Sequence, residues 1–285
     1  MPVVRRTWLF VPGADPQAHD VAARSHADVI IQELEDFTPP ELRPKARTLA
    51  ALLYDRWRNA GKLAAVRVNP LETCGRDDLA AVMAGRPDIV LMSKVAAPEQ
   101  VRALEQATGG DVDLVPNVET AAGLMRTFEI AKASRRVIAL LVASEDMVAD
   151  LGTNRSRGGG ELAYVRSRFL VECRAAGVEA IDCPYTFSDV KGAVADARKA
   201  KQLGYRAKSL VDPSHAAPIN RVFSPSPVEL HNARKIVAAF EKARASGRER
   251  ASVGGKLVEV PIYAAAKRLL ESAGRIQPAR RKKGR

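Results

Sequence analysis

The chain has 285 residues, of which 46% are hydrophobic, 27% charged and 5% aromatic, a composition typical of a globular protein with a well-buried core. No segment approaches the roughly 18 to 20 unbroken apolar residues of a membrane helix, and the start, MPVVRRTWLFVPG, has too short an apolar run for a secretory signal. The three cysteines lack CxxC spacing, so we expect neither a disulfide framework nor a zinc site. We expect a cytoplasmic location.

The positive charge is concentrated at the C-terminus. The formal net charge is +12, and the last eleven residues, RIQPARRKKGR, carry six positive charges and no negative one. We interpret residues 275–285 as a basic disordered tail. The alternative is a binding or regulatory module whose tail grips RNA, DNA or an acidic partner, but no aromatic side chains are interleaved with the charges, so nucleic acid is not an expected partner.

Eight short apolar runs follow one another along the chain and predict strands. Each run is mostly continuous in hydrophobicity, as in strands that are buried on both faces of a parallel sheet. The runs are 7–11, 28–34, 63–69, 88–93, 112–118, 137–143, 178–183 and 207–212. Segments of helical periodicity separate them, among them PEQVRALEQAT and DVKGAVADARKAKQLG. Strand and helix in eightfold alternation predict a TIM (β/α)8 barrel over residues 1–222. A doubly wound open sheet is the main alternative, although no G-x-G-x-x-G follows the first strand.

The region after the eighth strand has a different character. PINRVFSPSPVELHNARKIVAAFEKARASG predicts a turn and one long amphipathic helix, VGGKLVEVP a hairpin or a loop, and IYAAAKRLLESAG a final helix. We therefore expect a C-terminal helical extension or lid over residues 223–274.

Polar residues stand at the ends of the predicted strands, where a TIM barrel performs its chemistry. They include Glu33, Glu35, Asp36, Arg67, Asn69, Ser93, Lys94, Asn117, Glu119, Ser144, Glu145, Asp146, Asp182, Lys208 and Asp212. Carboxylates on neighbouring strands can hold a hard divalent cation, and Mg²⁺ suits two carboxylates plus waters. Taken singly, Glu119 or the Ser144-Glu145-Asp146 run could instead cap the helix that follows. Arg67 lies within an apolar strand, where a buried guanidinium needs an anionic partner.

Six ordered motifs resemble the HpcH/HpaI aldolase and citrate lyase β-subunit family, which includes citryl-CoA, citramalyl-CoA and malyl-CoA lyases. They are RRTWLFVPG, ELED, VRVNP, VPNVET, SEDMVADLG and PINRVFSPSP, and the resemblance extends from Arg5 to about Leu270. It implies a TIM barrel that holds Mg²⁺ through Glu119 and Asp146. It also implies that Arg67, with Glu119, binds the substrate, and that Glu35 and Asp36 bond the magnesium-bound waters.

The resemblance further implies a catalytic acid on the C-terminal segment, which reaches over a neighbouring subunit in malyl-CoA and citramalyl-CoA lyases. The family has Asp in a V-D-x-P setting, and this chain has Glu259 in Val258-Glu259-Val260-Pro261. Phe37 and Ser144, with Val211-Asp212-Pro213, depart from the family pattern near the site and on the side that meets CoA.

The implied function is Mg²⁺-dependent cleavage of a 3-hydroxyacyl-CoA to acetyl-CoA, or a related acyl-CoA, and a 2-oxo acid. Two alternatives keep the metal site: a CoA-independent aldolase acting on 2-oxo acids, and a malyl-CoA thioesterase. The implied partners are an acyl-CoA or a small 2-oxo or hydroxy acid, and further copies of the chain in a homo-trimer or hexamer.

Overall fold

The computed structural model describes residues 5–248 and 250–275. They divide into a compact unit, Arg5–Phe223, and a second unit that begins at Ser224. Of the predicted basic tail, residues 276–285 lie outside the described residues.

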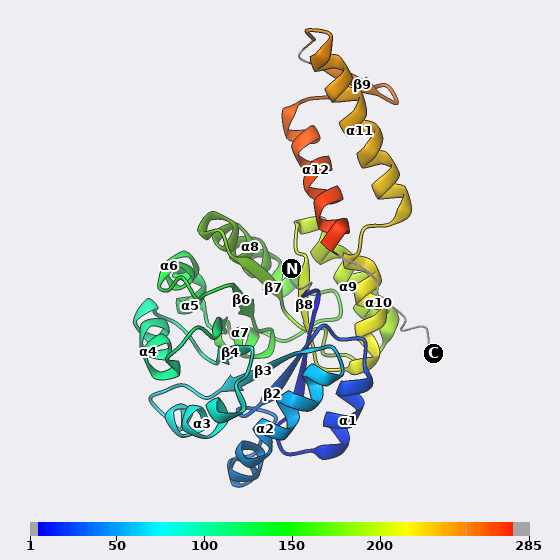
Figure 1. Ribbon diagram of the computed structural model, residues 1–285. Helices are drawn as coiled ribbons and strands as arrows, with labels where there is room; N and C mark the ends of the chain where they lie inside the picture. The colour runs from blue at the N-terminus through cyan, green and yellow to red at the C-terminus, as the bar shows by residue number, and fades with distance from the viewer. Residues whose placement is uncertain (1–4, 249, 276–285) are drawn as a thin grey trace, which may run out of the picture. The chain divides into compact units, whose positions relative to one another are not determined.

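Eight parallel strands close into a barrel in the order in which they occur along the chain (Figure 1). The strands are β1 (Thr7–Pro12), β2 (Val29–Glu33), β3 (Leu63–Val68), β4 (Ile89–Met92), β5 (Asp113–Val118), β6 (Ala139–Val142), β7 (Glu179–Asp182) and β8 (Ala207–Leu210). Strand β8 pairs with β1, which closes the sheet. The prediction of a TIM barrel is confirmed, and the open sheet is excluded.

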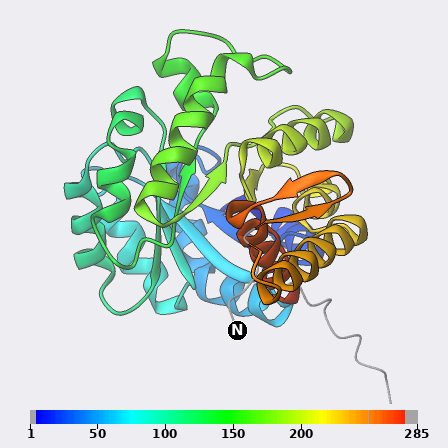
Figure 2. The ribbon, with the colours of Figure 1, turned by 90° about the horizontal axis from the view of Figure 1, so that it is seen from above.

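Helices surround the strands on the outside of the barrel (Figures 1 and 2). They are α1 (Pro16–Arg24), α2 (Arg43–Asn59), α3 (Gly75–Val82), α4 (Pro98–Thr108), α5 (Ala121–Met125), α6 (Thr127–Lys132), α7 (Glu145–Asp150), α8 (Ala163–Ala176), α9 (Val190–Leu203) and α10 (Ala216–Phe223). Short 3₁₀ turns occur at Pro40–Leu42, Met83–Gly85, Gly160–Leu162 and Pro213–His215.

The strands separate two layers of apolar side chains. One layer fills the barrel and consists of Trp8, Phe10, Val29, Ile31, Ala65, Ile89, Leu91, Val115, Ala139, Leu141, Ile181 and Ala207. The other, larger layer lies between strands and helices. Since side chains alternate along a strand, the next positions on the inner face after Ile31, Ala65 and Val115 are Glu33, Arg67 and Asn117. These polar side chains therefore lie at the carboxyl-terminal mouth of the barrel.

Asp182 and Lys208 do not belong to the mouth, contrary to the expectation from their places at strand ends. Ile181 and Ala207 occupy the inner face, so their neighbours Asp182 and Lys208 face the surrounding helices. The Lys208 ammonium lies 2.6 Å from Asp182 Oδ2 and 2.6 Å from Asp196 Oδ2. A position at the end of a strand does not show whether the side chain points into the barrel or outward. Asp182 and Lys208 each lie one residue beyond an inward-facing position, so they point outward and form a buried ion-pair network.

The second unit consists of α11 (Pro227–Ala245), β9 (Ala251–Val253), β10 (Lys256–Val258) and α12 (Val260–Arg275). Strands β9 and β10 form the predicted hairpin, with Gly254 and Gly255 in the left-handed region at its turn. The segment predicted as a turn and one long helix begins instead within helix α10, and a short non-helical break at 224–226 separates it from α11. The proline of α10, Pro218, falls in the first turn of the helix, where the missing N–H has no intrahelical partner to lose.

No helix within the described ranges is long and apolar enough to cross a membrane.

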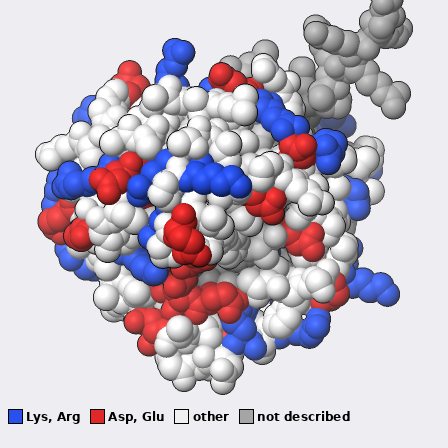
Figure 3. Space-filling view, turned by 90° about the horizontal axis from the view of Figure 1, so that it is seen from below, with Lys and Arg blue, Asp and Glu red and all other residues white. Residues whose placement is uncertain are grey.

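Lys and Arg side chains are interspersed with Asp and Glu over the face shown in Figure 3. The described part of that face therefore has no continuous basic surface of the kind that binds a nucleic acid backbone.

Candidate active site

Arg67 lies at the centre of a cluster of carboxylates. It is on β3, directly opposite Glu33 of β2 in the parallel register, and its Nε donates to Glu33 Oε1 at 2.9 Å. Nη2 lies 3.1 Å from Glu35 Oε2 and 3.4 Å from Asp36 Oδ2. Nη1 lies 3.6 Å from Glu119 Oε1, across from the β2 residues. One buried guanidinium thus faces four carboxylates, which raise its pKa against the effect of burial.

Glu33 fixes the loop that carries two of these carboxylates. Its Oε1 also accepts a hydrogen bond from Glu35 N at 2.6 Å, and its Oε2 accepts one from Phe37 N at 2.5 Å. The Thr38 hydroxyl donates to the Glu33 carbonyl at 2.5 Å and accepts from Gly13 N at 2.8 Å. The sequence indicated no role for Glu33, because a sequence does not show that Glu33 of β2 lies directly opposite Arg67 of β3.

Gly13 is required where β1 approaches this loop. A Cβ at Gly13 would lie 2.5 Å from the Glu33 carbonyl oxygen, closer than any side chain tolerates. The glycine of the FVPG motif therefore belongs to the support of the carboxylate loop.

Glu119 follows β5 and is buried, with both carboxylate oxygens lacking a hydrogen bond from any described residue. Burial raises its pKa to about 8; Arg67 opposes the shift, whereas Asp146 and Glu35 add to it. The capping alternative does not account for Glu119, since Thr120 caps α5 by accepting a hydrogen bond from Gly123 N at 3.1 Å.

Asp146 lies in the first turn of α7, at the end of the loop from β6. It lines the same cavity as Asp36 and Arg67, and burial, followed by the charge of Asp36, raises its pKa. Its neighbour Ser144 makes no capping hydrogen bond with its side chain.

Lys94 is a further charged residue of the site, and its sequence context indicated no role for it. It follows β4 with φ of 56°, one of the two non-glycine residues with positive φ among those described, a conformation that costs a lysine roughly 1 kcal/mol. Its Nζ lies 2.5 Å from Glu35 Oε1 and 4.0 Å from Asp36 Oδ1. The hydrogen bond to Glu35 raises the pKa of Lys94.

The charges of the cluster do not balance. The two cations Arg67 and Lys94 face the carboxylates of Glu33, Glu35, Asp36, Glu119 and Asp146. Apart from the ion pair with Arg67 at 3.6 Å, the buried Glu119 carboxylate has no hydrogen bond from a described residue, and such a carboxylate is costly unless a further cation binds it. Within the described ranges, no three His, Cys, Asp or Glu side chains converge as a preformed metal cage. Mg²⁺ needs no such cage, because it keeps several waters and takes one or two carboxylates. The residues therefore fit this ion.

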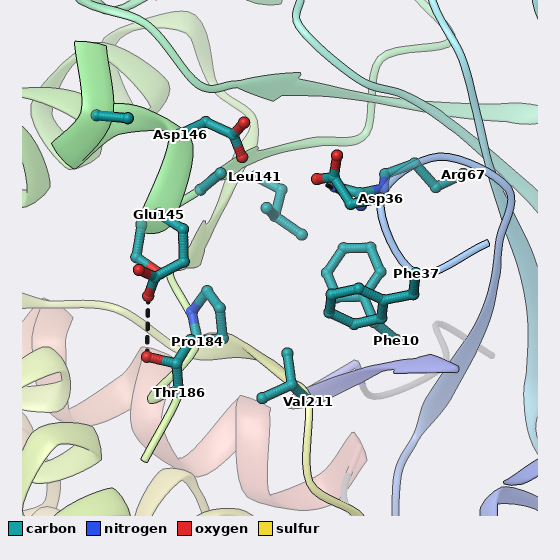
Figure 4. A pocket seen from close by; sticks show the side chains of 13 residues that line it. Phe10, Asp36, Phe37, Arg67, Leu141, Glu145, Asp146, Pro184, Thr186 and Val211 are labelled. Atoms are coloured by element: carbon teal, nitrogen blue, oxygen red, sulfur yellow. Dashed lines mark hydrogen bonds and ion pairs between the residues drawn. The ribbon is translucent and has the colours of Figure 1, made fainter. Parts of the chain in front are cut away.

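A cavity of about 590 Å³ opens beside the carboxylates (Figure 4), a size typical of small-molecule sites. It is lined by Phe10, Asp36, Phe37, Arg67, Leu141, Ala143, Ser144, Glu145, Asp146, Ala149, Pro184, Thr186 and Val211. On one wall, Thr186 Oγ1 donates to Glu145 Oε1 at 2.9 Å.

Glu259, the predicted catalytic acid, belongs to the second unit. It is exposed between β10 and α12, and its Oε1 lies 3.8 Å from Arg250 Nε. Of the predicted site residues, the barrel unit brings together Arg67, Glu119, Asp146, Glu35 and Asp36. Glu259 belongs to the second unit and is not among them.

Comparison with known proteins gives consistent results. The sequence profile of the HpcH/HpaI aldolase/citrate lyase family matches residues 6–213. The citrate lyase subunit beta of Leuconostoc mesenteroides subsp. cremoris is 30% identical over 282 residues, which cover 95% of this chain and 93% of that protein. A (3S)-malyl-CoA thioesterase of Cereibacter sphaeroides is 32% identical over 270 residues, with 94% of each chain covered. The crystal structure of CitE from Mycobacterium tuberculosis with magnesium, acetoacetate and coenzyme A has a TM-score of 0.80 and 28% identity, and the match covers 95% of this chain and 98% of that one.

Proposed function

Because the chain belongs to the HpcH/HpaI aldolase/citrate lyase family, we propose that it is a Mg²⁺-dependent carbon–carbon lyase. Its substrate would be a 3-hydroxyacyl-CoA of the citryl, citramalyl or malyl type, and its products an acyl-CoA and a 2-oxo acid. The observation that carries the proposal is the buried Glu119 carboxylate without a hydrogen-bond donor, next to an acid-rich cavity.

Glu119 and Asp146 would hold the ion, and Glu35 and Asp36 would accept hydrogen bonds from its waters. Bound Mg²⁺ supplies a Lewis acid to the hydroxyl and carboxylate oxygens of the substrate. The magnesium in the related CitE crystal structure supports the choice of this ion.

Arg67 would bind the oxygen that becomes the carbonyl of the 2-oxo acid. In the cleavage, a base removes the proton of the C3 hydroxyl, the C2–C3 bond breaks, and its electron pair forms the enolate of the thioester. Protonation of that enolate at C2 gives the acyl-CoA. The Arg67 guanidinium is held in a fixed orientation by Glu33, so it stabilises charge on the substrate oxygens without reorganising.

Glu259 is our candidate for the group that transfers the proton. We propose that residues 223–274 act as a lid and that Glu259 serves the site of a neighbouring subunit in a homo-trimer or hexamer. The exposure of Glu259 supports this, because its ion pair with Arg250, at 3.8 Å, lies at the surface and leaves the carboxylate accessible to another site.

Hydrolysis of a malyl-CoA thioester is the second candidate, because a relative that is 32% identical is a (3S)-malyl-CoA thioesterase. The two reactions differ in their products. A lyase releases acyl-CoA together with a 2-oxo acid, whereas a thioesterase releases a free thiol and a hydroxy acid.

The test uses the full chain with Mg²⁺ and citryl-CoA, citramalyl-CoA and malyl-CoA, with acyl-CoA, 2-oxo acid and free thiol measured together. We expect Glu119→Gln and Asp146→Asn to lower kcat/KM by at least about 100-fold and to weaken Mg²⁺ binding in calorimetry. Asp113→Asn is the matched control, since Asp113 starts β5 at the opposite end of the barrel and pairs with Arg5. Wild-type turnover by both site variants would overturn the proposal.

A further inference from the structure

The cavity has two chemically different sides. Figure 4 shows Asp36, Arg67 and Asp146 along one side. The rest of the labelled lining is mainly apolar and includes Phe10, Phe37, Leu141, Pro184 and Val211, and the polar pair Glu145–Thr186 lies beside Pro184. A ligand that binds its polar groups to the acid-rich side must therefore present its remaining atoms to aromatic and aliphatic carbon.

Phe37 is the most exposed part of the apolar side. Its side chain remains 40% accessible, and its ring meets Phe10 edge-on, with the ring centroids 6.4 Å apart and the planes at 74°. Phe10 in turn lies under Arg67, with the guanidinium carbon 4.8 Å from the ring centroid. The Glu33 carboxylate holds the backbone of Phe37, and the ring packs against Phe10 while its remaining surface is open to a ligand.

No lining residue offers a free positive charge to a second carboxylate on the ligand. Among the described residues that line the cavity, the only Lys or Arg is Arg67, whose guanidinium already faces four carboxylates. Glu145 lies next to Thr186 and pairs with Arg155 at 3.3 Å, and Arg155 also binds Glu161, so this arginine is already engaged by two carboxylates. A ligand carboxylate against these groups would be desolvated and repelled without a partner.

We propose that the hydroxy-acid end of the substrate bears an alkyl substituent and no second carboxylate, so that cleavage gives pyruvate or a longer 2-oxo acid and not oxaloacetate. This inference rests on the proposed lyase function and specifies its substrate class. Phe37 is the specificity-determining residue, because its exposed ring is the apolar surface that the substituent covers.

The experiment compares four thioesters that differ in one substituent on C3. Malyl-CoA carries hydrogen, citramalyl-CoA methyl, its homologue ethyl, and citryl-CoA a carboxymethyl group. We expect kcat/KM for the methyl and ethyl compounds to exceed that for citryl-CoA by at least about 10-fold, the discrimination that a single methylene or a missing polar partner commonly gives. Citryl-CoA turnover equal to or above that of citramalyl-CoA would overturn the inference and leave the lyase function intact. Turnover of none of the four would overturn both.

Binding provides a readout that does not depend on turnover. With Mg²⁺ present, calorimetry should give tighter binding of pyruvate and 2-oxobutyrate than of oxaloacetate to the full chain, and the reverse order would overturn the inference.

Two substitutions test the role of Phe37. Phe37→Ala should abolish the preference for ethyl over hydrogen, and Phe37→Leu should retain most of it. Phe128→Ala is the matched control, because Phe128 is also exposed but lies on α6 at the outside of the barrel. Unchanged ratios in Phe37→Ala would contradict the assignment of this residue.

Discussion

Replacement of Arg67 by lysine tests whether the site needs the shape of the guanidinium or only its charge. Arg67 binds Glu33 through Nε at 2.9 Å and reaches Glu119 through Nη1 at 3.6 Å. These contacts lie on different sides of one planar group. A lysine ammonium is a single point with three donors, so it can retain only one side of this arrangement.

The expected loss follows from the contacts. A hydrogen bond to a charged group contributes about 1.5–3 kcal/mol, and lysine loses one or two of the contacts that orient Arg67 toward the substrate. A loss of about 3–4 kcal/mol in the transition state corresponds to a decrease of roughly 100- to 1,000-fold in kcat/KM. The net charge of the cluster is conserved, and the fold should persist.

Steady-state kinetics at saturating Mg²⁺, with the preferred thioester, measures this loss. Arg136→Lys is the matched control, because Arg136 donates to Val112 O at 2.8 Å and to Thr108 Oγ1 at 2.9 Å, next to the start of β6 and away from the mouth. We expect the control to change kcat/KM by less than about 2-fold. If Arg67→Lys retains wild-type kcat/KM, a positive charge alone suffices, and the planar shape of the guanidinium is not needed.

Two further predictions concern stability. Without metal, the free energy of unfolding should fall as the pH rises through about 8, because the folded-state pKa of Glu119, about 8, lies above its ordinary 4.5 and the native state binds this proton more tightly. Its contribution is complete below the unfolded pKa and is lost above about 8, so Glu119→Gln should flatten a urea-denaturation profile from pH 5 to 9, and an unchanged slope would contradict this. Lys208→Met leaves Asp182 and Asp196 with Arg166 as their remaining cation, so unfolding should cost about 3 kcal/mol less, the low end for a broken buried ion pair. A loss under about 1 kcal/mol, as for an exposed pair, would contradict that estimate.

The sequence predicted the barrel well because its strands are buried on both faces. Continuous apolar runs such as 28–34 and 63–69 gave strands that the structure has as Val29–Glu33 and Leu63–Val68. Burial on both faces removes alternation, and thus the information about which residues point inward. That is why the sequence could not separate Arg67, on the inner face, from Lys208, on the outer face.

The site itself could be predicted in composition but not in its connections. The sequence indicated that Arg67 needs an anionic partner and that Glu35 and Asp36 gather near it, and the structure brings these residues into contact. The bracing by Glu33 and the strained backbone of Lys94 depend on register and loop conformation, which no local pattern encodes. The catalytic and metal-binding roles of Arg67, Glu119, Asp146 and Glu259 stay predictions.

The hydrogen bonds of Glu33 have a consequence for redesigning this enzyme. One carboxylate holds Arg67, the backbone of Glu35 and the backbone of Phe37. An insertion or deletion between residues 33 and 38 would displace the carboxylates and the aromatic wall together, and metal affinity would be lost along with the old selectivity. New selectivity should therefore be sought by substituting Phe37 without changing the length of the loop. Its side chain can be replaced while its backbone N–H keeps the hydrogen bond to Glu33.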